Sequence, residues 1–170
     1  DLLIKNFDPN LIKTELNILK KVGAKIRLFK NSIQIKGPEK IKSIRNITTK
    51  EYDGFPTDLA PQFMVLLCRA NGTSSITENI FQGRFLHAME LQRLGAKISI
   101  KNRTAKIEGN TNFKAAEVMS SDLRASAALI LAGIVSKGNT IVTRVYHCDR
   151  GYEKIENKLK KIGVKIKRIK

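Results

Sequence analysis

The sequence predicts a mixed α/β (α+β) fold, an inside-out α/β barrel of βαβαββ repeats with buried helices and outer sheets. One observation is a segment from Leu19 to Ile26 that returns as Leu91 to Ile98 and again as Leu159 to Ile166. Another is a pair of apolar helical runs, opened by Thr57-Asp58-Leu59 and by Ser121-Asp122-Leu123. Repeats of this length indicate a supersecondary unit copied around an axis, so equivalent ends of the copies can meet at one place.

The first half of each unit is a strand followed by a long helix. Apolar residues recur at i, i+4, i+7, i+8 and i+11 in residues 59–70 and 123–134, and a glycine follows each run. The preceding strands are expected at 41–48 and 115–119. Helices this apolar should be buried, with strands wrapped around them. The alternative is a conventional layered α/β arrangement.

The second half of each unit is a strand, a shorter helix and a β-hairpin. Strands are expected at 74–78 and 140–145, shorter helices at about 9–23, 85–95 and 152–163, and hairpins at 25–29 with 32–36 and at 97–100 with 105–108. The last copy retains only the first hairpin strand, after Gly163. We therefore expect one incomplete domain over 1–170, with units at about 1–37 (partial), 41–109 and 113–170 (partial), as a piece of a longer protein.

Composition excludes several classes of protein. The chain has 170 residues and is 42% hydrophobic, enough for one domain with a core. Its longest apolar run, 125–135, is shorter than the roughly 20 residues that span a bilayer, so no membrane partner is expected. The first residues lack a signal-peptide pattern. Cys68 and Cys148 form no disulfide framework, and free thiols favour a reducing, cytoplasmic compartment.

The net charge of +17 raises the possibility of a nucleic-acid partner. However, lysine is spread over most segments, tryptophan is absent and other aromatic residues are few. No basic helix or stacking motif is present. A solvated basic surface is therefore favoured over nucleic-acid binding. His87 and His147 have no metal-ligand spacing, so no metal is expected.

Three arginines are predicted at helix starts: Arg84, Arg124 and Arg150. A cation in the first turn opposes the helix dipole and costs a few tenths of a kcal/mol. That cost disappears if guanidinium groups and helix N-terminal amides bind an anion together. The alternative is a surface ion pair, for which Asp149 and Glu153 are available to Arg150.

Asp58 and Asp122 occupy equivalent positions before the two long helices. Each can cap its helix, which contributes about 1 kcal/mol, and capping is the simpler interpretation. Each can also act as a general base, because nearby arginines would keep the carboxylate ionised, and the two roles can coexist at the same helix end. If the helix N-termini face one way, Asp58 should lie with the three arginines at one end of the domain.

Five blocks of the sequence carry a family resemblance. They are Gly54-Phe55-Pro56-Thr57-Asp58, Ile76-Thr77-Glu78-Asn79-Ile80-Phe81, Arg84-Phe85, Asp122-Leu123-Arg124-Ala125-Ser126-Ala127 and Tyr146-His147-Cys148-Asp149-Arg150-Gly151-Tyr152. In this order they resemble the UDP-N-acetylglucosamine 1-carboxyvinyltransferase family. The 5-enolpyruvylshikimate-3-phosphate synthases share that family's fold but are less similar in these blocks.

The resemblance implies a fold and a reaction. The family has two domains of three βαβαββ units each, with substrates bound between them. Its members transfer the enolpyruvyl group of phosphoenolpyruvate to the 3′-hydroxyl of UDP-N-acetylglucosamine and release phosphate, the first committed step of peptidoglycan synthesis. No cofactor is implied. This chain would supply one wall of that site, and the second domain would be its missing partner. The alternatives are a 5-enolpyruvylshikimate-3-phosphate synthase-like transferase and a non-catalytic module that binds anions or nucleic acid.

The resemblance also implies roles for single residues. Asp58 would contact the hydroxyl and act as base, and the Ile80 backbone would contact the nucleotide-sugar. Arg124 and Arg150 would hold phosphoenolpyruvate, with support from Arg84, while Asp122 would stabilise the site. The usual Phe-Glu-Asn-Arg stretch is Phe81-Gln82-Gly83-Arg84 here. The family's acid cysteine lies in the other domain, and neither cysteine of this chain matches it.

Overall fold

The computed structural model describes residues 1–169, and its middle part contains one whole unit. The elements follow in the order strand, helix, strand, helix, strand, strand: β4 (Ile47–Thr48), α2 (Ala60–Cys68), β5 (Thr73–Thr77), α3 (His87–Arg93), β6 (Lys97–Lys101) and β7 (Thr104–Glu108). A short 3₁₀ turn, η2 (Thr57–Leu59), leads into α2. This is the order expected for residues 41–109, although the unit and domain boundaries themselves stay a prediction.

The flanking segments repeat parts of this unit. Before it come β1 (Leu2–Lys5), the 3₁₀ turn η1 (Pro9–Ile12), α1 (Lys13–Lys21), β2 (Lys25–Phe29) and β3 (Ser32–Lys36). After it come β8 (Glu117–Met119), α4 (Leu123–Ile134), β9 (Ile141–Thr143), α5 (Tyr146–Asp149) and α6 (Ile155–Lys161). The predicted hairpin 25–29 with 32–36 is confirmed residue by residue.

The two ends of the chain differ from expectation, by one strand that was not predicted and by one predicted strand that is absent. The strand β1 was not predicted, because Leu2-Leu3-Ile4-Lys5 has no alternation of polar and apolar residues, and only its pairing with β3 defines it as a strand. The strand expected after Gly163 is absent from the described residues 164–169. A strand needs a hydrogen-bonded neighbour, and the structure describes no hairpin partner for this segment.

The sheets have a common topology. In the four-stranded sheet β4-β5-β7-β6, β5 pairs in parallel with β4 and antiparallel with β7. The parallel pair β8-β9 matches the first part of this sheet, and the antiparallel sheet β1-β3-β2 matches its remainder. Sheet pairing therefore repeats in the same way as the sequence.

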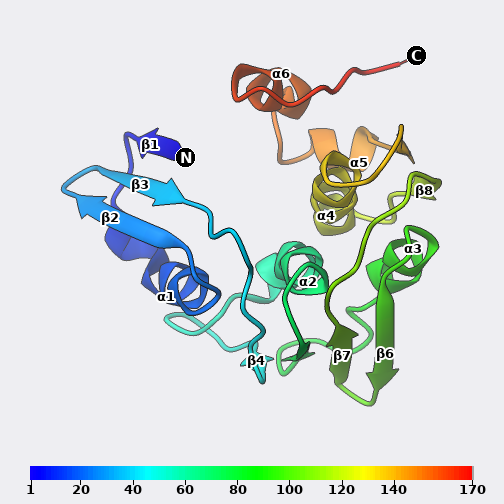
Figure 1. Ribbon diagram of the computed structural model, residues 1–170, viewed down its shortest axis with the longest axis horizontal. Coiled ribbons are helices and arrows are strands. Elements are labelled where there is room, and N and C mark those ends of the chain that lie inside the picture. Colours follow the sequence, from blue (N-terminus) through cyan, green and yellow to red (C-terminus); the bar gives the residue numbers. More distant parts are fainter. Residues whose placement is uncertain (170) are drawn as a thin grey trace.

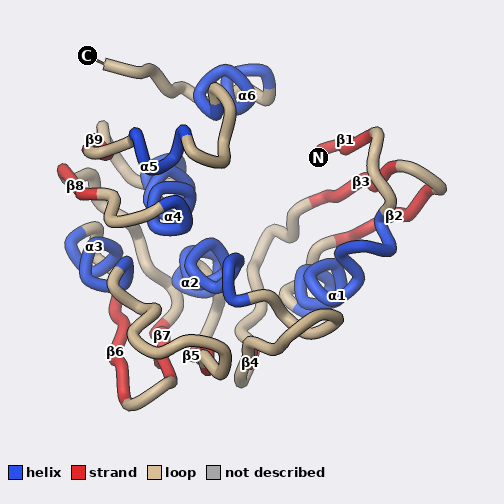
Figure 2. Tube along the Cα trace, turned by 180° about the vertical axis from the view of Figure 1, so that it is seen from behind, coloured by secondary structure: helices blue, strands red, loops and turns tan. Residues whose placement is uncertain are grey.

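Helices form the interior of the molecule. Figure 1 shows α2 at the centre, with α4 beside it and the strands around the outside, and Figure 2 gives the same arrangement from behind. Phe63, Met64, Val65, Leu67 and Cys68 of α2 are all buried, on more than one side of the helix. A helix that is apolar all round must be covered on all sides, so the inside-out fold class is confirmed.

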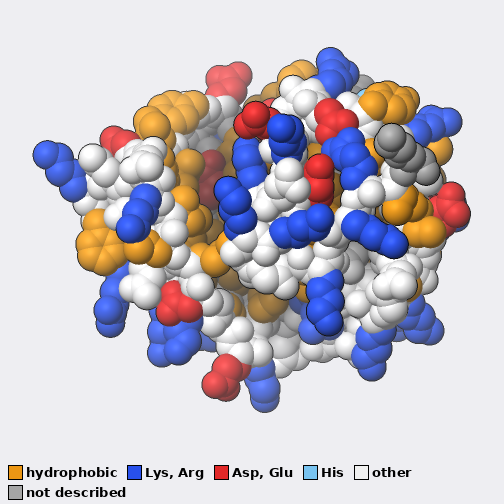
Figure 3. Space-filling model, turned by 90° about the horizontal axis from the view of Figure 1, so that it is seen from above, with side chains coloured by type: hydrophobic (Ala, Val, Ile, Leu, Met, Phe, Trp, Pro, Cys, Tyr) orange, Lys and Arg blue, Asp and Glu red, His pale blue; other side chains and the backbone are white. Residues whose placement is uncertain are grey.

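Charged side chains lie mostly outside this core. Figure 3 shows Lys and Arg side chains distributed over one face and along its edges, between acidic and uncharged groups. None of the helices described in residues 1–169 has both the length and the apolar composition that crossing a membrane requires.

Candidate active site

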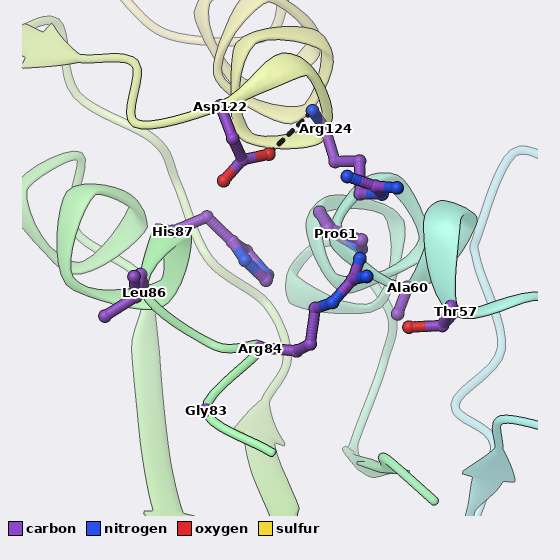
Figure 4. A pocket seen from close by; sticks show the side chains of 9 residues that line it. All are labelled: Thr57, Ala60, Pro61, Gly83, Arg84, Leu86, His87, Asp122 and Arg124. Atoms are coloured by element: carbon purple, nitrogen blue, oxygen red, sulfur yellow. Dashed lines mark hydrogen bonds between the residues drawn. The ribbon is translucent and has the colours of Figure 1, made fainter. Parts of the chain in front are cut away.

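A cavity of about 240 Å³ opens where α2, α3 and α4 approach one another. Figure 4 shows the guanidinium groups of Arg84 and Arg124 facing this space, with His87 pointing into it from the opposite side. The lining residues come from the turns and first residues of these helices: Thr57, Ala60, Pro61, Gly83, Arg84, Leu86, His87, Asp122 and Arg124. The cavity is therefore surrounded by helix N-termini, as the repeat predicts.

Asp58 joins the two arginines at this cavity. The Arg124 Nε–H donates to Asp58 Oδ1, and Arg84 Nη1 lies 3.4 Å from the same oxygen. The hydrogen bond from Arg124 lowers the pKa of the Asp58 carboxyl; burial opposes that shift, and both arginine charges reinforce it. Because the Asp58 side chain is 58% exposed, the pair is screened by water but accessible to a ligand.

Asp122 has a different role, because it caps α4. Its backbone is extended, with φ −161° and ψ 177°, and its Oδ1 accepts from the amides of Arg124 at 2.8 Å and Ala125 at 3.0 Å. Burial raises the pKa of the Asp122 carboxyl, but these two amides, a bond from Ser121 and the proximity of His87 lower it overall. The capping predicted for Asp122 is confirmed. For Asp58 it was wrong, because no side-chain bond caps η2 or α2.

Arg84 does not start a helix, contrary to expectation. It follows Gly83, whose φ of +68° turns the chain, and α3 begins only at His87. Its guanidinium lies over the Phe81 ring, with the Cζ atom 4.1 Å from the ring centre. A cation over an aromatic face is attracted to it, so the ring helps to fix Arg84 beside Asp58.

Arg150 also departs from the prediction. It follows α5 as its C-cap residue, so it ends a helix rather than starting one. The next residue, Gly151, packs against the side chain of Leu123 at the start of α4. Within residues 1–169, no hydrogen bond or ion pair joins the Arg150 side chain to Asp58, Arg84 or Arg124. The structure thus joins three of the four expected residues.

Ile80 lies in the loop between β5 and α3. Its amide donates to Glu78 Oε1 at 2.8 Å, so that N–H is already satisfied inside the protein. The Ile80 backbone can therefore contact a ligand through its carbonyl oxygen. Sequence reasoning gave no role to Glu78, although an acidic residue at the end of a predicted strand is a visible signal.

Sequence reasoning also gave no role in the site to His87. The side chain is only 4% exposed, and its Nε2 has no hydrogen-bond partner within the described residues. Burial lowers the pKa of His87 to about 4, while the Asp122 charge opposes the shift. His87 is therefore neutral at pH 7. Its position two residues after the buried Phe85 was the only signal in the sequence.

Other reactive side chains are not arranged for chemistry. Cys68 is fully buried in the core, as expected, and burial raises the pKa of its thiol to about 12. Residues 1–169 contain no group of three or more His, Cys, Asp or Glu side chains placed to hold a metal ion.

Known proteins resemble this chain over nearly its whole length. The family described as EPSP synthase (3-phosphoshikimate 1-carboxyvinyltransferase) matches residues 1–159. Similar curated relatives include the UDP-N-acetylglucosamine 1-carboxyvinyltransferases of Pelagibacter ubique (strain HTCC1062), 60% identical over 169 residues, and of Desulfosudis oleivorans, 47% identical over 169 residues. Each alignment covers 99% of this chain, and the chain spans only 40% of each relative's length. The resemblance proposed from the sequence blocks is confirmed.

Solved structures share the fold. The enolpyruvyl transferase NikO from Streptomyces tendae superposes with a TM-score of 0.89 at 24% identity, over 98% of this chain and 39% of that one. EPSP synthase from Acinetobacter baumannii superposes with a TM-score of 0.77 at 18% identity, over 99% of this chain and 42% of that one. At these identities the likeness establishes the enolpyruvyl transferase fold.

Proposed function

Because the chain belongs to the EPSP synthase (3-phosphoshikimate 1-carboxyvinyltransferase) family, we propose that it supplies one wall of an enolpyruvyl transferase active site. The reaction is transfer of the enolpyruvyl group from phosphoenolpyruvate to the 3′-hydroxyl of UDP-N-acetylglucosamine, with release of phosphate. The substrates follow from the name of the relatives that are 60% and 47% identical to this chain. The reaction would then belong to peptidoglycan synthesis in the cytoplasm. The observation that carries the proposal is the pairing of Asp58 with Arg84 and Arg124, two arginines that line the cavity.

The chemistry needs a base and an anion site close together. In the transfer, the hydroxyl oxygen bonds to the enolpyruvyl carbon while its proton is lost, and the carbon–oxygen bond to phosphate breaks. Asp58 is the base in this proposal, because its carboxylate is ionised and more than half exposed. Arg84 and Arg124 bind the anionic donor, since guanidinium groups bind phosphate and carboxylate through paired hydrogen bonds.

The ion pair suggests how the substrate prepares the base. Without a ligand, both arginines lower the pKa of Asp58, which makes it a weak base. A phosphate or carboxylate group that attracts the two guanidinium groups competes with Asp58 for them. Asp58 then loses hydrogen bonds and becomes a stronger base when the donor substrate is present.

The remaining predicted residues have supporting roles. Asp122 fixes the start of α4, and with it the position of Arg124, through its two amide bonds. Arg150 adds charge from the segment that packs on Leu123, and the Ile80 carbonyl contacts the nucleotide-sugar. Because the relatives are longer than this chain, we expect the 170-residue chain alone to release no phosphate from phosphoenolpyruvate.

The activity can be tested in a chimera. The chain replaces its counterpart in the Pelagibacter ubique relative, which is 60% identical over 169 residues, and phosphate release is followed with both substrates. Turnover that requires UDP-N-acetylglucosamine is expected. A chimera that folds, binds neither substrate and turns over nothing would contradict the proposal, as would turnover by the isolated chain.

The anion site can be tested in the isolated chain. Sulfate at matched ionic strength should raise the melting temperature more than chloride does, because it binds the native state. Arg124→Ala should reduce that gain. Arg93→Ala is the control, because Arg93 is exposed and paired with Glu90 on the outer part of α3. Equal gains in wild type and both variants would mean general salting-out and no anion site.

A further inference from the structure

The loop after β5 is anchored by a buried acidic side chain, Glu78. The residue is 1% exposed, and no arginine or lysine pairs with its carboxylate within the described residues. A buried charge without a counter-ion is costly unless hydrogen bonds compensate for it. Here four donors do so. Oε1 accepts from Thr49 Oγ1 at 2.9 Å and from the amides of Ile80 at 2.8 Å and Phe81 at 3.0 Å, and Oε2 accepts from Thr57 Oγ1 at 2.7 Å.

These four bonds keep the carboxylate ionised. Burial alone would raise the pKa of Glu78, but the bonds from Thr57, Phe81, Thr49 and Ile80 lower it below the usual value. The backbone of Glu78 is fixed as well. Its amide donates to the Arg103 carbonyl at 2.8 Å, and Arg103 Nε donates to the Glu78 carbonyl at 2.7 Å. Glu78 is thus held rigidly by the turn between β6 and β7.

Two of these four donors, Thr57 and Phe81, belong to the segments that hold the candidate site residues Asp58 and Arg84. Thr57 directly precedes Asp58 in η2, so the Thr57 bond fixes the turn that presents the candidate base. Phe81 supports the Arg84 guanidinium on its ring, so the Phe81 bond fixes the residue below the anion-binding arginine. The two segments are far apart in sequence and meet at one carboxylate.

We propose that Glu78 is a positioning residue that sets Asp58 and Arg84 at their mutual distance. It touches no substrate in this arrangement and acts through Thr57 on one side and through Phe81 on the other. The inference deepens the proposed function, but the positioning itself concerns only residues of this chain. Its test therefore needs no turnover.

The decisive variant removes one hydrogen bond to Glu78 and leaves the carboxylate of Glu78 in place. Thr57→Val keeps the side-chain shape and removes the hydroxyl that binds Glu78 Oε2. Thr57→Ser restores that hydroxyl. Thr104→Val is the matched control, since it removes a 3.0 Å hydroxyl bond to Thr77 in the same sheet without touching Glu78. Glu78→Gln is the second variant, because it keeps the shape and replaces the charged acceptor by a neutral one.

The readout is the titration of the Asp58 carboxyl carbon by NMR in the isolated chain. In Thr57→Val the turn that carries Asp58 should relax away from Arg124 and Arg84. The pH midpoint of the Asp58 titration should therefore rise towards the value of an unperturbed aspartate. Thr57→Ser and Thr104→Val should titrate as wild type. In Glu78→Gln the Ile80 and Phe81 amide protons should move upfield, because their acceptor has lost its charge, and the Asp58 midpoint should rise less than in Thr57→Val.

The outcomes separate positioning from plain stability. A structural role alone would lower the melting temperature of Thr57→Val and Thr104→Val alike and leave the Asp58 midpoint unchanged, which would overturn the proposal. If Thr57→Val does not fold, an unshifted Asp58 midpoint in Glu78→Gln overturns it equally. If the midpoints move as expected while Asp58 is dispensable for turnover in the chimera, positioning stands and the proposed function falls.

Discussion

Asp58 and Asp122 stand at equivalent points of the repeat, each before a buried helix, yet their carboxylates bind different partners. Asp122 accepts from two backbone amides at the start of α4. Asp58 accepts from the side chains of Arg124 and Arg84. One aspartate therefore stabilises a helix, while the other binds two arginines that line the cavity.

The difference has a local cause in the chain. Asp122 binds the amides of the residues two and three positions further on, Arg124 and Ala125. The corresponding residues after Asp58 are Ala60 and Pro61. Proline has no N–H, and the Ala60 amide donates to the Thr57 carbonyl instead. Asp58 has no capping donors left, so its carboxylate is available to the arginines.

The comparison teaches that a repeat predicts where residues lie better than it predicts what they bind. Thr57 and Ser121 also differ in this respect. Thr57 donates to the buried Glu78, whereas Ser121 donates to the neighbouring Asp122. One helix start is tied to the loop of the candidate site, and the other is satisfied within its own turn.

The largest effect is expected from Asp58→Asn in the chimera. Loss of a general base should lower kcat by roughly 10² or more. The free energy of unfolding should change by less than about 0.5 kcal/mol, because the side chain is exposed. Steady-state kinetics and urea unfolding measure the two quantities. An unchanged kcat with a large loss of stability would mean that Asp58 resembles Asp122 after all.

The next effect is a pH dependence of the free energy of unfolding that His87 sets. This side chain faces Asp122, Arg84 and Arg124 across the cavity. The unfolded chain takes up a proton at His87 below about pH 6.5, whereas the folded chain does so only near the pKa of about 4. Between these values the unfolded state binds more protons, so stability falls as the pH falls. The loss should reach up to about 3 kcal/mol.

Unfolding by urea at a series of pH values between 7 and 4 measures this loss of stability. His87→Gln should flatten the dependence, and His147→Asn is the control, since His147 stacks on Tyr146 outside the cavity. Asp58, Glu78 and Asp122 have pKa values lowered from 3.8, 4.5 and 3.8, so their own losses of stability begin only as the pH approaches these values and continue below them. A slope that persists in His87→Gln would assign the effect to another group.

A smaller effect is expected from Asp122→Ala, which removes the cap of α4. The free energy of unfolding should fall by about 1 kcal/mol, and Asp122→Asn should recover most of it because asparagine caps nearly as well. Thermal or urea unfolding of the isolated chain decides this. Equal losses for the alanine and asparagine variants would show that charge, rather than capping, makes Asp122 stabilising.

The smallest effect, and the sharpest for the comparison, is expected from Pro61→Ala. The new amide offers Asp58 the donor that Ala125 offers Asp122, so part of the Asp58 population should turn towards the helix. Stability should change by no more than about 1 kcal/mol, since a gained cap offsets lost packing. The Arg124 Nε–H resonance should move upfield. No movement would mean that the arginines alone decide the orientation of Asp58.

The sequence by itself determined the order of the elements in the middle unit and the burial of the long helices. Local signals were sufficient there: the apolar period of α2 and α4, the glycines that end them, and the hairpin pattern of β2 and β3. The sequence also identified Asp122 as a cap. Pro61 is visible in the sequence too, and its lack of an N–H already removes one of the donors that Asp58 would need to cap α2.

Only the tertiary structure decided which charged groups meet. Arg124 reaches Asp58 because α2 and α4 pack side by side. Glu78 joins Thr57 to Phe81 because its two carboxylate oxygens, at the end of β5, accept hydrogen bonds from both residues. Arg150 illustrates the limit from the other side. Its place in the repeat suggested a helix start, but the extra helix α5 moved it to a helix end. Periodicity reports the distribution of apolar side chains along one element, whereas a polar contact depends on where separate elements bring a few atoms within about 3 Å.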